Sequence, residues 1–159
     1  MTETTLHYVA SPTTRRLVER ALKAIREDFM VAENAVMMTS PSIFTDYLKL
    51  RFIDHEREHF GVIFLNNQNQ IIATEILFSG TLNHVEVHPR VIARKALLHN
   101  AHALLLAHNH PSGEVLPSQS DKAVTKKIVN CMNMLDIQVL DHIIISPEKH
   151  YSFAQHSLL

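Results

Sequence analysis

The chain has 159 residues and a mass of 18.1 kDa, which is the size of one ordinary domain. Hydrophobic residues make up 46% and charged residues 19%, a composition typical of a globular protein and not of a disordered one. Fifteen Lys and Arg against sixteen Asp and Glu give a net charge of −1. Because holding duplex DNA by charge requires a basic surface, we do not expect direct nucleic-acid binding.

The sequence indicates a cytoplasmic protein. Its apolar stretches, such as residues 61–65, are far shorter than the roughly 18 residues needed to cross a membrane. Residues 1–12 are polar and lack the charged and apolar regions of a signal peptide. Cys131 is the only cysteine, so neither an internal disulfide nor a cysteine-based zinc cage can form. We therefore expect a cytoplasmic location without membrane association.

The N-terminal part of the chain predicts two helices. The first starts at Ser11–Pro12, where serine can cap and proline suits the first helical position, and apolar residues follow at helical spacing. A second start signal at Ser40–Pro41 predicts a short helix, and residues 33–39 between the two are ambiguous. We expect residues 1–36 to form a helical extension and residues 37–159 to form the main domain.

From residue 59 onward the pattern changes to strands that alternate with helices. The expected strands cover residues 59–65, 70–78, 103–107, 137–145 and 151–153. The first two are joined by a polar hairpin turn at residues 66–69. The expected helices cover residues 89–100 and 118–135. This order predicts an α/β fold with three layers, in which helices flank a mixed sheet.

The segment from residue 108 to residue 121 contains the residues that could bind a metal ion or take part in catalysis. His108 and His110 are two positions apart at the C-terminal end of a predicted strand, so both imidazoles face the same side and can reach one metal ion. Asp121, in the first turn of the next helix, adds a carboxylate oxygen. Two His and one carboxylate leave a fourth position for water, as in catalytic zinc sites, although iron and manganese use similar ligands.

Each of these features also has a purely structural interpretation. A His-x-His pair is weak evidence in a chain with twelve histidines. The pattern Ser118-x-x-Asp121 is typical of a helix N-terminal cap, in which the Ser118 hydroxyl accepts from the Asp121 backbone N–H. The two interpretations are compatible, because a capped first turn would hold Asp121 in a fixed position.

The pattern His-x-His-Pro, six residues, then Ser-x-x-Asp resembles the JAMM motif of JAB1/MPN metalloproteases. Further segments resemble the JAMM domain of the RadC family in order and spacing, and the likeness covers about residues 41–155. These segments are Gly80-Thr81-Leu82, Val87-His88-Pro89-Arg90, residues 106–113 and Asp141-His142-Ile143-Ile144. The resemblance implies a three-layer JAB1/MPN-like fold, which is related to that of cytidine deaminases.

The resemblance also implies roles for single residues. Members of the family use a Glu at the start of the strand after the first helix to activate the metal-bound water, and Glu58 occupies that place. Glu56 and Glu75 are the alternatives for this base. The Ser118 hydroxyl is expected to donate to the developing oxyanion. One catalytic Zn²⁺ per chain is expected on three ligands: His108, His110 and Asp121.

Proteins with this motif cleave peptide or isopeptide bonds in extended tails. The resemblance therefore implies a zinc-dependent metallopeptidase or isopeptidase that acts on a protein or peptide, such as an extended C-terminal tail. Two alternatives stay open: a non-catalytic MPN-type interaction module, and a DNA-repair-associated accessory protein, as the family name suggests. We also expect that the chain can form a homodimer.

Two other enzyme classes fit the sequence poorly. A zinc deaminase needs a Pro-Cys-x-x-Cys ligand pair, which a single cysteine cannot supply. Nucleases named for His and Asn draw these residues from separated positions, not from a tripeptide such as residues 108–110. RadC proteins commonly begin with a helix-hairpin-helix region. The first forty residues contain no Gly-rich hairpin, so we expect a short form of the family.

The pair Asp141-His142, at the start of the last long strand, has two interpretations. It can orient a metal ligand, since a metal-bound His usually donates its second N–H to a partner. It can equally be a buried Asp–His pair that closes the sheet, and the sequence favours this second interpretation.

Overall fold

The structure is a computed structural model that describes residues 11–31, 41–52, 56–80 and 86–159. The described helices are α1 (Pro12–Val31), α3 (Pro41–Arg51), α4 (Pro89–Leu98) and α5 (Gln119–Asn133). The strands are β1 (His59–Leu65), β2 (Ile71–Ser79), β3 (Ala103–Asn109), β4 (Gln138–Ile145) and β5 (His150–Ser152). None of the described helices has the length and apolar character that a membrane crossing requires.

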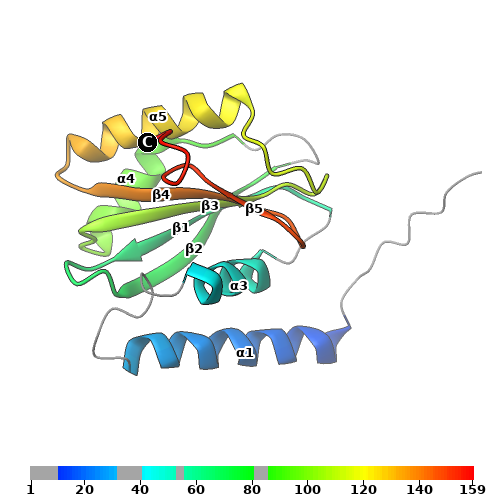
Figure 1. Cartoon of the computed structure of the whole chain (residues 1–159). Coiled ribbons are helices and arrows are strands. Elements are labelled where there is room, and N and C mark those ends of the chain that lie inside the picture. Colours follow the sequence, from blue (N-terminus) through cyan, green and yellow to red (C-terminus); the bar gives the residue numbers. More distant parts are fainter. Residues whose placement is uncertain (1–10, 32–40, 53–55, 81–85) are drawn as a thin grey trace, which may run out of the picture.

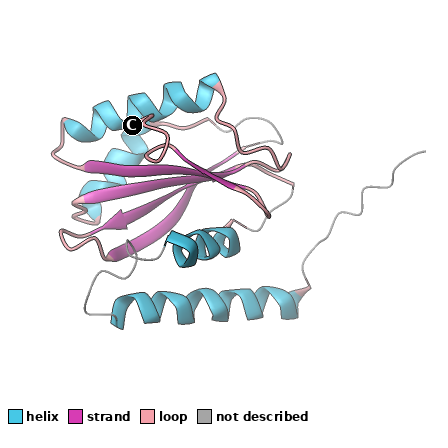
Figure 2. Cartoon of the chain, viewed as in Figure 1, coloured by secondary structure: helices cyan, strands magenta, loops and turns pink. Residues whose placement is uncertain are grey.

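The five strands of the described chain form one mixed sheet with the order β2-β1-β3-β4-β5. Only the β3–β4 pair is parallel, and the other neighbours are antiparallel. Helices α4 and α5 cover one face of this sheet, and α3 covers the other with α1 outside it (Figures 1 and 2). This arrangement confirms the predicted three-layer α-β-α fold.

The predicted elements agree closely with the observed ones. Helices α4 and α5 and the five described strands lie within two residues of their predicted bounds, and α1 and α3 begin at the predicted start signals. The predicted turn at residues 66–69 closes the β1–β2 hairpin through a bond from the Asn69 N–H to the Asn66 carbonyl. The ambiguous residues 33–39, and Thr81 and Leu82 of one family segment, lie outside the described residues. The division at residue 36 stays a prediction.

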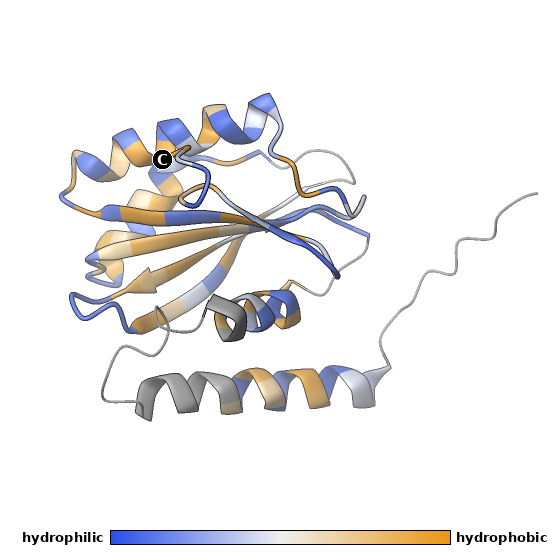
Figure 3. Ribbon diagram, in the orientation of Figure 1, coloured by the Kyte–Doolittle hydropathy of each residue, from blue (hydrophilic) through white to orange (hydrophobic). Residues whose placement is uncertain are grey.

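The core lies on both faces of the sheet, because every residue of β3 is buried. Figure 3 shows hydrophobic residues, in orange, along much of the sheet. Leu105 packs with Leu48 of α3 on one face. Leu106 packs with Ile92 of α4 and Ile128 of α5 on the other. Since side chains alternate along a strand, the even-numbered residues of β3 face the α4 and α5 side. His108 therefore lies on the same face as Leu106.

Gly61 in β1 permits an unusually close approach of α3 to the sheet. A Cβ atom at this position would lie 2.6 Å from Cζ of Phe52 and 3.1 Å from the Glu75 carbonyl oxygen. Phe52 is 4% exposed, so its ring has little room to move away. The absence of a side chain at residue 61 thus fixes where the C-terminal end of α3 meets β1.

Candidate metal centre

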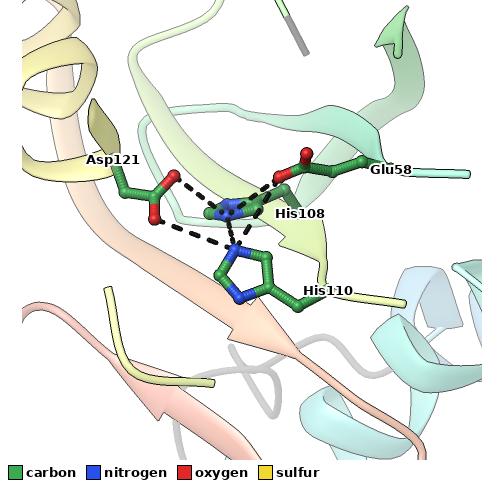
Figure 4. Close-up of side chains that lie close together, drawn as sticks. All are labelled: Glu58, His108, His110 and Asp121. Carbon is green, nitrogen blue, oxygen red and sulfur yellow. Dashed lines mark hydrogen bonds and ion pairs between the residues drawn. The ribbon is translucent and has the colours of Figure 1, made fainter. Parts of the chain in front are cut away.

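Four side chains from separate parts of the chain converge at one end of the sheet (Figure 4). Their ligand atoms, two imidazole nitrogens and two carboxylate oxygens, all lie within 4.8 Å of one another. The four residues are Glu58, His108, His110 and Asp121. The predicted metal ligands and the predicted base are thus brought together in one cluster.

The register of β1 against β3 explains why Glu58 meets the histidines. Phe60 of β1 is paired with His108 of β3 in an antiparallel ladder. Glu58 lies two residues before Phe60, and His110 lies two residues after His108. In an antiparallel pair, Glu58 and His110 are therefore opposite each other. Glu58 Oε1 lies 3.8 Å from His108 Nε2 and 3.7 Å from His110 Nε2.

Asp121 reaches the cluster from the first turn of α5, where it also completes the helix cap. The Ser118 hydroxyl accepts from the Asp121 N–H at 3.1 Å, and Asp121 Oδ2 accepts from the Ser118 N–H at 2.7 Å. This reciprocal pair is a capping box, so the predicted cap is confirmed. The other carboxylate oxygen, Oδ1, lies 3.3 Å from His108 Nε2.

The surroundings of Asp121 favour its ionised form. Burial raises the pKa of this carboxyl group, but hydrogen bonding and charge attraction to His108, with two further bonds from Ser118, outweigh burial. The net effect holds the pKa of Asp121 well below its usual range. A carboxylate that stays ionised near neutral pH is available as a metal ligand.

His110 is oriented by a backbone group. Its Nδ1 lies 2.7 Å from the Glu114 carbonyl oxygen. A carbonyl can only accept, so Nδ1 carries a proton and donates, and Nε2 of the neutral ring keeps its lone pair. Nε2 of His110 lies 2.9 Å from Nε2 of His108. A cation between these nitrogens would be held by the imidazoles and the Asp121 carboxylate, so the donor set fits a JAMM-type site for a metal such as Zn²⁺.

The Ser118 hydroxyl is occupied in a way the sequence did not indicate. It donates its hydrogen to Asp121 Oδ2 at 2.6 Å. A hydroxyl has one hydrogen, so Ser118 would have to give up this bond to donate to an oxyanion. Its expected role as an oxyanion donor stays a prediction.

The two alternatives for the base lie elsewhere. Glu75 bonds to Lys95 at 2.6 Å and to His99 at 2.5 Å, where it joins β2 to α4. Glu56 is exposed and is not part of the cluster. Only Glu58, among these three residues, faces the histidines, and its side chain is 9% exposed.

Asp141 and His142 point in different directions and do not form a side-chain pair with each other. The Asp141 carboxylate accepts from the Ser152 hydroxyl at 2.6 Å and from the Ala154 N–H at 2.9 Å, which fastens the C-terminal segment. His142 Nε2 lies 2.8 Å from Nδ1 of His108. The interpretation favoured from the sequence, a buried Asp–His pair, is therefore wrong, because adjacent residues of a strand face opposite sides.

Two residues near the cluster were not singled out from the sequence. Asn109 bonds to the backbone on both sides of Glu58. Thr125 bonds to the ring of His142 and to the backbone of Asp121. Asn109 could have been found from its position between the two predicted ligands on a strand, because this position places its side chain on the opposite face from theirs. The signal for Thr125 is its position four residues after Asp121 in a helix, where a hydroxyl can bond back to the carbonyl.

A cavity of about 570 Å³ lies beside the cluster. His88 and Pro89 at the start of α4 line one side, and Val124 and Lys127 of α5 line another. All four cluster residues also line this cavity. The cluster is thus reachable by a molecule larger than water.

The fold and the cluster together define a JAB domain. The model of the RadC-like JAB domain matches residues 38–158, and the chain belongs to this family. It is 48% identical to the UPF0758 protein YkfG of Escherichia coli strain K12, with 94% of this chain and 93% of that protein covered. It is likewise 48% identical to the UPF0758 protein YeeS of the same strain, with 94% and 99% covered. A UPF0758 protein of Thiobacillus denitrificans is 44% identical, with 87% of this chain and 61% of that protein covered.

Proposed function

We propose that this chain is a Zn²⁺-dependent hydrolase that cleaves an amide bond in a protein or peptide, as a metallopeptidase or isopeptidase. The observation that carries this proposal is the convergence of four donor side chains within 4.8 Å beside an open cavity. Three of them would hold the ion: His108, His110 and Asp121. When bound, Zn²⁺ polarises a carbonyl and lowers the pKa of water from about 15.7 towards about 7.

Glu58 is the residue placed to move protons. Its Oε1 lies within 4 Å of both Nε2 atoms, on the opposite side of the cluster from Asp121 (Figure 4). In the proposed reaction, Oε1 accepts a proton from the attacking water. The same atom later delivers this proton to the amine nitrogen that leaves, which completes the hydrolysis of the amide.

The cavity supports a substrate larger than a single amino acid. It extends from the cluster along α5 to Lys127, which follows Asp121 by six positions, a rise of about 9 Å along the helix. Apolar side chains such as Val87 and Val124 line it together with the polar ones. A short stretch of extended polypeptide fits these dimensions.

The proposal is tested with purified protein loaded with Zn²⁺ and a library of internally quenched fluorescent peptides. We expect about one zinc per chain by elemental mass spectrometry and hydrolysis of at least one peptide. Glu58→Gln is expected to retain the zinc and to lose at least about 100-fold in kcat. His108→Ala is expected to lose both zinc and hydrolysis.

Asp121→Asn is the matched control for the helix cap, because Asn keeps an oxygen that can accept from Ser118 while it loses the charge. We expect this variant to stay folded and to bind zinc more weakly. A wild-type protein that takes up no metal when zinc is offered at neutral pH would overturn the proposal. Zinc binding without turnover of any peptide would instead favour a non-catalytic interaction module.

A further inference from the structure

His142 lies next to the candidate metal centre, where it bonds to His108. The residue is fully buried, and its ring stacks on Phe153 and meets Phe60 edge-on. Its two nitrogens bond in opposite directions. Nε2 lies 2.8 Å from His108 Nδ1, and Nδ1 lies 2.6 Å from the hydroxyl oxygen of Thr125.

The direction of these bonds is fixed at the Thr125 end. The Thr125 hydroxyl donates to the carbonyl oxygen of Asp121 at 2.6 Å, because a carbonyl oxygen can only accept. A hydroxyl has one hydrogen, so Thr125 must accept in its bond with His142. His142 Nδ1 therefore carries a proton and donates to Thr125.

The same reasoning continues to the metal ligand. Burial favours the neutral form of the His142 ring, and a neutral ring protonated on Nδ1 has its lone pair on Nε2. This lone pair accepts from His108, so His108 carries its proton on Nδ1. Because His142 holds this proton on Nδ1, the nitrogen of His108 that can offer a lone pair to a metal ion is Nε2, the atom that faces Asp121 and His110.

We propose that Thr125 and His142 are positioning residues that fix the tautomer of His108, so that its Nε2 is ready to bind a metal. This inference rests on the metal site of the proposed function. The bonds run from His108 through His142 and Thr125 to the backbone of Asp121. This chain of hydrogen bonds, called the relay below, thus joins two proposed metal ligands that lie on different elements, β3 and α5.

Packing alone does not account for an imidazole at residue 142. Its ring neighbours Phe60 and Phe153 are apolar and buried, and an apolar side chain would fill this space without burying polar atoms. Both ring nitrogens of His142 have partners, so each buried polar atom takes part in the relay. Without these bonds, nothing would favour Nδ1 over Nε2 as the protonated atom of His108.

The test compares two variants of Thr125. Valine has nearly the shape of threonine but cannot accept a hydrogen bond, so in Thr125→Val the proton of His142 is expected to move to Nε2. That nitrogen then donates to His108 Nδ1 and forces the proton of His108 onto its metal-facing Nε2. Serine keeps the hydroxyl, so Thr125→Ser is the matched control.

Two measurements are made on the full chain near pH 7. Titration calorimetry with Zn²⁺ is expected to show affinity in Thr125→Val reduced by about 10-fold to 100-fold, and affinity in Thr125→Ser close to wild type. Nitrogen-15 spectra of the histidine rings in the metal-free protein are expected to show His108 protonated on Nδ1 in wild type and Thr125→Ser. In Thr125→Val, the proton is expected on Nε2.

Equal zinc affinity and the same tautomer in wild type and Thr125→Val would overturn the relay while leaving the proposed hydrolase intact. A wild-type protein that binds no zinc would instead overturn the proposed function. In that case the spectra alone decide the relay, because a wild-type His108 without a proton on Nδ1 would contradict it. The same wild-type spectrum decides the question if Thr125→Val does not fold.

Discussion

The side-chain amide of Asn109 holds the backbone on both sides of Glu58. Its Oδ1 accepts from the His59 N–H at 2.7 Å, and its Nδ2 donates to the Arg57 carbonyl at 2.9 Å. Asn109 is 4% exposed and lies between the two histidines of the cluster, with its side chain on the opposite face of β3. The strand that supplies two of the proposed metal ligands therefore also fixes the position of the expected base.

Replacing Asn109 is expected to disturb Glu58 more than the metal ligands. Asn109→Ala removes both hydrogen bonds, so we expect a loss of about 1–3 kcal/mol in the free energy of unfolding, measured in urea. If the Glu58 carboxylate shifts by about 1 Å, kcat for peptide hydrolysis falls by up to about 100-fold. Zinc affinity is expected to stay near the wild-type value. Asn67→Ala, in the exposed β1–β2 turn, is the control and should change neither quantity.

Unchanged stability in Asn109→Ala would mean that water replaces the amide without cost. Loss of zinc together with activity would mean that Asn109 acts on His108 and His110 and not on Glu58.

Ser118→Ala separates a structural role of this hydroxyl from a role at the oxyanion. The variant removes the hydroxyl that accepts from the Asp121 N–H and donates to Asp121 Oδ2. We expect a loss of about 1 kcal/mol in stability from the missing cap. Because Asp121 is then held less firmly, we also expect weaker zinc binding by calorimetry. A drop in kcat with unchanged zinc affinity would show that the hydroxyl acts on the substrate alone.

Gly61→Ala is expected to destabilise the fold by about 1–3 kcal/mol, because the new Cβ would lie 2.6 Å from the Phe52 ring. Urea unfolding of a double-mutant cycle tests this cause. Phe52→Leu replaces the ring with a smaller side chain, so Gly61→Ala should cost less in the Phe52→Leu background than in the wild type. An equal cost in both backgrounds would place the strain at the Glu75 carbonyl instead.

Glu75→Gln is expected to show a stability deficit that depends on pH. The bond from Lys95 lowers the pKa of Glu75 from its ordinary value of 4.5; burial opposes this shift, and the bond from His99 adds to it. A folded-state pKa below the unfolded one means that ionised Glu75 stabilises the fold above about pH 4.5, and that this stabilisation is lost as the pH falls through the folded-state pKa. We expect a deficit of at most about 1 kcal/mol near pH 7, because the pair is partly exposed.

The measurement is urea unfolding of wild type and Glu75→Gln between pH 7 and pH 3. The difference in stability should shrink below about pH 4.5. A difference that stays constant across this range would mean that the charge of Glu75 does not contribute, and that the variant acts through packing.

The elements and the ligand cluster could be predicted because their signals are local. The spacing of His108 and His110 on a strand, and of Ser118 and Asp121 at a helix start, depends on periodicity within a few residues. Glu58 is fifty residues from His108, and only the family resemblance pointed to it. The register of β1 against β3 supplies the physical reason.

The supporting hydrogen bonds could not be predicted in the same way. His142 is 34 residues from His108, and Thr125 is 17 residues from His142, so their meeting depends on how α5 packs over β3 and β4. The direction of each bond follows from the Asp121 carbonyl, which accepts from the Thr125 hydroxyl, and this contact is known only from the structure. Asp141 and His142 were treated as one pair because they are adjacent in the sequence, although they face opposite sides of β4.

Side chains at the C-terminal end of β3 alternate between the two faces of the sheet. This alternation restricts which insertions and deletions the strand can tolerate. An insertion or deletion of one residue in this strand would place Asn109 where a histidine stands and turn both imidazoles toward α3. The ligands, the amide that secures Glu58 and the contact with His142 would be lost together, while the apolar residues of the strand would also exchange faces. The loop that follows is restricted as well, because the six residues between Pro111 and Ser118 set the reach from the histidines to Asp121, and the Glu114 carbonyl in this loop bonds to His110. Length changes are therefore expected to accumulate among relatives in the exposed β1–β2 turn instead.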